Sequence, residues 1–137
     1  MNGHRKVLLD TDMLSLYLRK SPNVIAEAQQ YLQSQGIFTF SIITRFEILR
    51  GMMVRNASAQ LKAFDLFCLQ NEIFELDDNI IIRASEVYAD LHKRGQLVGD
   101  ADILIAATAL ENDLPVVTNN ESHFNRIPGL HVLNWNR

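Results

Sequence analysis

The sequence VLLDTD at residues 7–12 is a short apolar run that ends in acidic residues, and it decides how the chain is expected to fold. Similar apolar runs occur at residues 37–40 and 116–118, and polar residues follow both of them. Continuous apolar runs are typical of strands in a parallel sheet that is covered on both faces. Ligand sites in such sheets lie beyond the carboxyl ends of the strands. We therefore expect the residues that follow these three runs to meet in one site.

Helical segments separate the predicted strands, which indicates an α/β fold in which crossover helices connect the strands. At 137 residues, the chain is long enough for one domain, residues 1–137, and too short for two. Cap and turn residues give the expected boundaries of the elements. The predicted helices cover residues 23–35, 42–54, 57–70, 79–94 and 101–112, and the remaining strands cover residues 73–76 and 132–133.

The composition is that of an ordinary globular protein of the cytoplasm. A single cysteine, Cys68, excludes an intrachain disulfide and agrees with a reducing compartment. No run reaches the roughly 18 apolar residues that span a membrane. The net charge of −3 has the wrong sign for binding nucleic acid through bulk electrostatics. That objection loses its force if the acidic residues cluster around bound cations, because the cations then invert the local potential.

The first candidate site residue is Asp10, at the mouth of the first predicted strand. An acid at this point can also cap the helix that begins near Met13. We interpret Asp12 as that cap and Asp10 as functional.

The second candidate is Glu47, which lies on a helix that opens directly after a strand and is capped by Ser41. Thr44 precedes it by three residues, so the two side chains share one helical face. The alternative is a surface glutamate paired with Arg45 or Arg50.

The segment GDADILIAA at residues 99–107 is the strongest local signal. Asp100 and Asp102 begin a helix that is otherwise almost entirely apolar, so a rigid and buried element holds them. Asp100 can be explained as the N-cap, and Asp102 gains from the helix dipole. After residue 117, Thr118 and Asn120 could hold a water or a phosphate, or form a turn before a short helix.

Converging carboxylates are best explained by metal chemistry. Mg²⁺ and Mn²⁺ prefer oxygen ligands, whereas acids without a cation would raise the pKa values of one another. A cation held in this way supports hydrolysis of a phosphodiester. None of the histidines has an evident partner in the sequence, so we expect surface or packing roles for His4, His92, His123 and His131.

Over essentially its whole length the sequence resembles a PIN domain of the VapC group, the toxins of bacterial toxin–antitoxin pairs. Each matching segment is weak alone, but the ordered set at these spacings is specific. The matching segments are residues 8–12, 41–47, 99–107 and 117–120, together with the tail at 124–130 and 134–135.

The resemblance implies a three-layer α/β/α fold with a short, mostly parallel central sheet. It maps Asp10, Glu47 and Asp102 onto the metal-binding acids of the family. Asp100 lies two positions before the usual acid, where its role would be that of an additional ligand or only that of a helix cap. Asn120 stands where many members have a fourth acid, which leaves open whether one or two metals bind.

The activity implied is a Mg²⁺- or Mn²⁺-dependent endonuclease that acts on RNA, forms a homodimer and is inhibited by a cognate antitoxin. In this hypothesis, Asp10 and Asp102 hold the cation, and Glu47 positions or deprotonates the attacking water. Supporting residues and RNA contacts complete the predicted site. The supporting residues are Thr11, Thr44, Thr118 and Asn120, and the candidate RNA contacts are Arg45, Arg50 and Lys93.

Two alternatives remain open at this point. The segment LDTD at residues 9–12 also fits the Asp-x-Asp motif of haloacid-dehalogenase phosphohydrolases, in which Asp10 would be the nucleophile. That fold is usually longer, and Glu47 would have no role in it. The second alternative is a PIN-type module that binds RNA or protein without catalysis. Asn120 and the acidic net charge favour this alternative, whereas the presence of all three acids argues more strongly against it.

Overall fold

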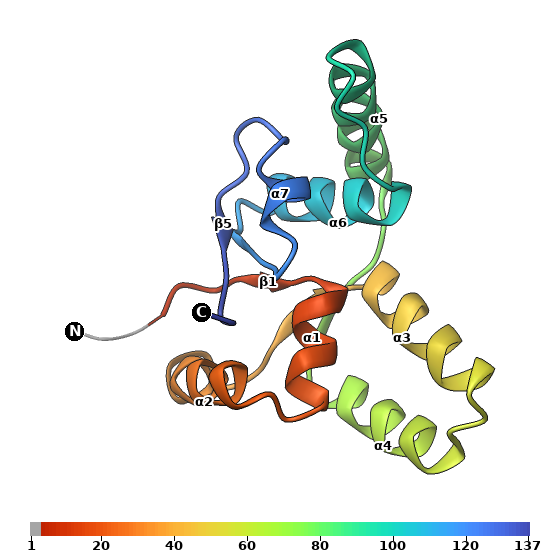
Figure 1. Cartoon of the computed structure of the whole chain (residues 1–137), viewed down its shortest axis with the longest axis vertical. Helices are drawn as coiled ribbons and strands as arrows, with labels where there is room; N and C mark the ends of the chain where they lie inside the picture. The colour runs from red at the N-terminus through yellow and green to blue at the C-terminus, as the bar shows by residue number, and fades with distance from the viewer. Residues whose placement is uncertain (1–3) are drawn as a thin grey trace.

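The parallel sheet expected from the apolar runs forms the centre of the molecule (Figure 1). The structure is a computed structural model and describes residues 4–137. Its five strands have the order β3-β2-β1-β4-β5, and every pairing is parallel. The strands are β1 (Leu8–Leu9), β2 (Thr39–Ser41), β3 (Glu72–Phe74), β4 (Val116–Val117) and β5 (Val132–Leu133).

The helices lie on both faces of this sheet, so the fold has the three α/β/α layers that the sequence resemblance implied. In Figure 1, α1 to α4 lie below the central strand β1, and α5 to α7 lie above it. The helices are α1 (Thr11–Leu18), α2 (Pro22–Gln35), α3 (Ile42–Val54), α4 (Ser58–Leu69), α5 (Asp78–Lys93), α6 (Asp100–Glu111) and α7 (Glu121–Phe124).

The alternation of side chains along the short strands separates the interior into two cores. Successive residues of a strand point to opposite faces. Leu9 and Val117 accordingly pack in the core beneath α1, α2 and α4. Their neighbours Leu8 and Val116 pack in the core beneath α5 and α6. Because both faces are covered, these strands need apolar residues at every position, which explains the continuous runs.

The strand order places a topological switch point between β1 and β4. The chain runs outward from β1 through β2 to β3, and then crosses back to place β4 on the other side of β1. Ligands in open α/β sheets bind at the carboxyl ends of the strands beside such a reversal. Asp10 directly follows β1 and Thr118 directly follows β4, so both residues lie at this position.

The predicted boundaries agree with the structure to within two residues at either end, including those of the third strand. That strand was expected at residues 73–76 but covers Glu72–Phe74. Its register with β2 explains the shift, because Thr39 pairs with Glu72 and Ser41 with Phe74. Within residues 4–137, no helix is both long enough and apolar enough to cross a membrane.

A buried tyrosine in α2 fixes the start of the central strand. Tyr31 is 1% exposed, and its hydroxyl accepts a hydrogen bond from the backbone N–H of Val7 at 3.1 Å. Replacing Tyr31 by Phe would leave this buried N–H without its partner. We expect Tyr31→Phe to lower the free energy of unfolding by about 1–3 kcal/mol in denaturant titrations.

Tyr88→Phe is the matched control, because Tyr88 is 43% exposed on α5. It should leave the free energy of unfolding almost unchanged. Equal stability of both variants and the unsubstituted protein would contradict the role assigned to Tyr31.

Candidate active site

Asp10 lies at the centre of the candidate site, where β1 passes into α1. Its side chain is almost fully buried, at 2% exposure. Oδ1 accepts a hydrogen bond from the backbone N–H of Met13 at 2.8 Å, which caps α1. Oδ2 accepts one from the hydroxyl of Thr118 at 2.5 Å. The prediction that Asp12 caps this helix was therefore wrong: Asp10 is the cap, and Asp12 lies exposed in the first turn.

Burial raises the pKa of the Asp10 carboxyl from 3.8 to about 7. The hydrogen bonds from Thr118 and Met13 lower the pKa, but they do not offset the loss of hydration. The negative charges of Asp12 and Asp102 raise it further. No basic side chain among residues 4–137 forms an ion pair with Asp10. The Asp10 carboxylate is therefore buried without a basic partner among these residues.

Asp102 enters the same site from the first turn of α6. Burial raises the pKa of its carboxyl, the contact with His123 opposes this, and the charge of Asp12 adds to it. Oδ2 lies 3.2 Å from Nδ1 of His123, and that nitrogen also lies 2.7 Å from Nδ2 of Asn120. In one tautomer Nδ1–H donates to Asp102, and in the other Nδ1 accepts from the amide.

His123 and Asp12 are therefore two site residues that the sequence reasoning missed. His123 was expected on the surface or in packing, but it contacts the Asp102 carboxylate from α7. The signal in the sequence was its place three residues after Asn120, in the segment that follows a predicted strand. Asp12 was interpreted as a cap, but its charge acts on both Asp10 and Asp102.

Asp100 lies apart from the other acids. The N-cap of α6 is Gly99, so the expectation that Asp100 caps the helix was wrong. Two residues along a helix turn the side chain to nearly the opposite face. Asp100 is accordingly exposed and lines a depression against α5 with Tyr88 and Leu104. The structure does not bring it to Asp10.

Hydroxyl contacts connect Glu47 on α3 to the residue that follows Asp10. The Thr11 hydroxyl donates to Glu47 Oε1 at 2.5 Å and lies 3.1 Å from the Thr44 hydroxyl. Thr11 directly follows Asp10, so this contact joins α3 to the start of α1. Arg50 lies 3.5 Å from Oε2, and the Glu47 side chain is 19% exposed. The predicted neighbours Thr11, Thr44 and Glu47 are thus together.

The three candidate RNA contacts have different positions. Arg50 lies beside Glu47, as described. Arg45 points toward α4 instead, where it pairs with Asp65 at 3.3 Å and stacks over Phe64. Lys93 lies in the last turn of α5, at the end of that helix far from the first turn of α1 (Figure 1). Of the three, Arg50 alone contacts a candidate site acid, Glu47.

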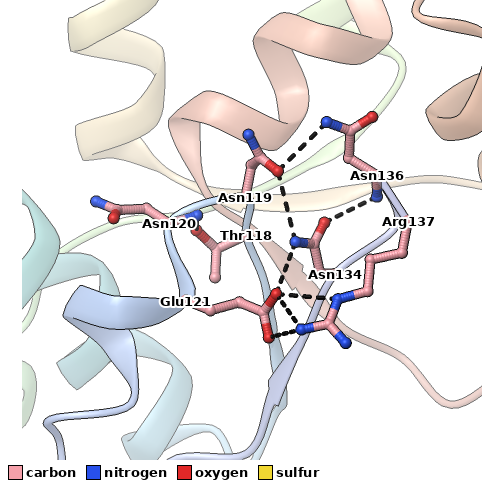
Figure 2. Close-up of polar contacts among 7 residues, drawn as sticks. All are labelled: Thr118, Asn119, Asn120, Glu121, Asn134, Asn136 and Arg137. Atoms are coloured by element: carbon pink, nitrogen blue, oxygen red, sulfur yellow. Dashed lines mark hydrogen bonds and ion pairs between the residues drawn. The ribbon is translucent and has the colours of Figure 1, made fainter.

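The loop after β4 divides its side chains between the site and the carboxyl-terminal tail. The backbone N–H of Asn120 donates to the Thr118 hydroxyl at 2.8 Å, and its side chain contacts His123. Figure 2 shows Asn120 pointing away from a second network, in which Glu121 binds Arg137 and Asn134. Arg137 and Asn134 hold the pKa of the Glu121 carboxyl below its usual value. Glu121 therefore anchors the tail and does not face the acids.

The donor set fits a hard divalent cation. Asp10 and Asp102 offer carboxylate oxygens, and the buried charge of Asp10 has no cation to balance it. Within residues 4–137, no group of three or more His, Cys, Asp or Glu side chains is preassembled for a metal. Mg²⁺ usually keeps several waters and is held by one or two carboxylates, so two acids at the switch point suffice.

The raised pKa of Asp10 leads to a pH-dependent prediction for the metal-free protein. The folded state binds the proton of the Asp10 carboxyl more tightly than the unfolded state does. Protonation of Asp10 therefore contributes fully to the free energy of unfolding below the ordinary aspartate pKa, and this contribution is lost as pH rises through about 7. Asp10→Asn removes the charge. Each unit of the difference between a pKa of 3.8 and one of about 7 corresponds to about 1.4 kcal/mol. At about pH 8 the variant should therefore be more stable than the unsubstituted protein by up to about 4 kcal/mol.

Denaturant titrations in a chelator, from about pH 5 to about pH 8, measure this difference. The advantage of Asp10→Asn should grow as pH rises. An advantage that is constant or shrinks with pH would show that the Asp10 carboxylate is not destabilising.

Comparison with known proteins agrees with this geometry. The family model described as PIN domain matches residues 7–130. Ribonuclease VapC1 of Methanocaldococcus jannaschii is 37% identical over 123 residues, which cover 89% of this chain and 81% of that protein. The tRNA(fMet)-specific endonuclease VapC of Salmonella typhimurium is 30% identical over 131 residues, 95% of this chain and 98% of that protein.

Solved structures agree as well. DNA-bound VapBC from Salmonella typhimurium superimposes with a TM-score of 0.85 at 28% identity, and the match covers 96% of this chain and 99% of that chain. VapBC-1 from nontypeable Haemophilus influenzae also gives 0.85, at 25% identity, with 97% and 100% covered. These matches set aside the haloacid-dehalogenase alternative. The chain belongs to the PIN-domain family and, within it, to the VapC group.

Proposed function

We propose that this chain is an endoribonuclease that depends on Mg²⁺ or Mn²⁺, with its active site at the carboxyl ends of β1 and β4. The observation that carries the proposal is the buried Asp10 carboxylate, which lacks a balancing cation and lies beside Asp102. Membership of the VapC group supports the activity, since relatives at 37% and 30% identity are named as a ribonuclease and a tRNA endonuclease.

Asp10 and Asp102 are the residues that would hold the cation. When bound, such a cation acts as a Lewis acid and offsets the negative charge that develops on a phosphodiester. Thr118 orients Asp10 through its hydrogen bond to Oδ2, and His123 orients Asp102 through Nδ1. These partners leave lone pairs free on both carboxylates, because each carboxylate oxygen accepts more than one hydrogen bond.

Glu47 is the residue suited to handle the attacking water. Its Oε1 is held by Thr11, whereas Oε2 has only the long contact to Arg50 and can accept a hydrogen bond from a water. A carboxylate fixed in this way can orient the water and take its proton as the water attacks phosphorus. Thr44 completes the support by holding Thr11 from the side of α3.

We also propose a cognate antitoxin as the protein partner, because the solved relatives are VapBC assemblies. Large apolar side chains exposed on α3 and α4 support a protein partner, since monomeric proteins seldom expose such groups together. These residues are Phe46, Met53, Val54, Leu66 and Leu69, with exposures of 55–83%. The homodimer stays a prediction, for which the exposed Ile81, Ile82 and Tyr88 of α5 are candidate contacts.

Cleavage of total cellular RNA tests the nuclease directly. We expect fragments with Mg²⁺ or Mn²⁺ and none in a chelator. Asp10→Asn and Asp102→Asn should each lower the rate by about 100-fold or more, as expected when a group that stabilises transition-state charge is lost. Asp113→Asn is the matched control, because Asp113 is an exposed acid beyond the end of α6, and it should keep full activity.

Glu47→Gln separates the alternatives further, because only the nuclease mechanism gives Glu47 a role. Its activity should fall with little change in cation binding, which calorimetry measures. A folded protein that binds Mn²⁺ and RNA but does not cut RNA would identify the chain as a non-catalytic binding module.

A further inference from the structure

We infer that the groove between α1 and α3 binds the sugar-phosphate backbone of the RNA substrate beside the cleavage site, with Arg19 and Arg55 as the phosphate contacts. The inference rests on the proposed nuclease function and adds to it the path of the substrate. Neither arginine was among the RNA contacts expected from the sequence.

The groove starts at the candidate active site. It has a volume of about 160 Å³, and its lining includes Thr11 and Glu47, the pair that joins α1 to α3. Ser15 and Gly51 line its middle, and Arg19 and Arg55 line its far end. A ligand in this groove would therefore reach from the Glu47 carboxylate to two guanidinium groups.

Helical spacing explains why the two walls match. Thr11, Ser15 and Arg19 are four residues apart, so they form one stripe along α1. Glu47, Gly51 and Arg55 repeat this spacing along α3, from acid to arginine. Both arginines are the C-cap residues of their helices. At about 1.5 Å per residue, each lies roughly 12 Å along the helix from its partner at the site.

Gly51 keeps the α3 wall open between the acid and the arginine. A Cβ added there would lie 3.5 Å from Nη1 of Arg55. The guanidinium therefore folds back along the groove over Gly51, toward Glu47. A longer side chain at this position would fill the space that the guanidinium and a bound phosphate share.

The charges of the chain favour an anion in this groove. The net charge is −3, and many basic side chains are already paired with acids. The paired ones are Lys6, Arg45, Arg50, Arg83, Arg94 and Arg137. Arg19 and Arg55 are exposed and form no ion pair with any residue in the range 4–137. The planar guanidinium suits bidentate contact with phosphate, so these two are available for a nucleic-acid backbone.

Binding of a short, fluorescein-labelled, single-stranded RNA of mixed sequence, followed by anisotropy in a chelator, tests the groove without cleavage. Arg19→Gln with Arg55→Gln should raise the Kd at least about tenfold. The slope of log Kd against log salt should fall by about 1.4, since each phosphate contact on a single strand contributes about 0.7. With Mn²⁺ present, KM should rise while kcat changes little.

Arg5→Gln with Lys62→Gln is the charge-matched control, because both residues are exposed and lie outside this groove. Unchanged RNA binding by the groove variant, or equal weakening by the control, would overturn the inference. So would a groove variant that keeps RNA binding but loses its antitoxin, because the groove would then be a protein interface. If the wild-type protein binds RNA through these arginines but does not cut it, the proposed nuclease activity is refuted and the proposed RNA-binding groove is not.

Discussion

The burial of the Asp10 carboxylate at the end of the central strand is the constraint on which the rest of the site depends. The same side chain caps α1 through the backbone N–H of Met13 and accepts a hydrogen bond from the hydroxyl of Thr118, which directly follows β4. This second bond joins residues that are 108 positions apart. Buried carboxylates are costly unless they are paired or coordinate a cation. The pKa of about 7 expresses that cost, and Asp102 and Asp12 increase it. The fold therefore holds in place a charge that a divalent cation would stabilise.

The surrounding elements hold the acids rigidly. Asp10 follows a fully buried strand. Asp102 lies on α6, which has more buried residues than any other helix within residues 4–137. Glu47 is held by the hydroxyl of Thr11, which in turn contacts the hydroxyl of Thr44. His123 is carried by α7, whose first residue, Glu121, is bound to the tail by Arg137. Precise placement of this kind lets a few oxygen ligands select the position of a cation and a phosphate.

The sequence predicted the fold well, because continuous apolar runs at residues 7–9 and 116–117 have one simple explanation in a covered parallel sheet. It also predicted that Asp10, Asp102 and Glu47 lie near one edge of that sheet. What it could not predict was the direction of individual side chains. The choice between Asp10 and Asp12 as the cap depends on backbone angles, and Arg45 faces α4 because of its place on the helical turn.

The contacts of His123 and the pair Arg19 and Arg55 depend on how separate helices pack. His123 meets Asp102 only because α7 lies against α6, and the residues are 21 positions apart. The two arginines share a groove because α1 and α3 are neighbours in space. Periodicity within one helix shows which residues share a face, but it does not say which other helix that face meets.

Proton release on cation binding is the measurement that tests the central claim most directly. Calorimetric titration with Mn²⁺, in buffers of different ionisation enthalpy, counts the protons displaced at about pH 6 and about pH 8. If the Asp10 carboxyl binds the cation and has a pKa of about 7, close to one proton should be released at the lower pH and almost none at the higher pH. Binding without proton release at the lower pH, or no binding at either pH, would contradict the account.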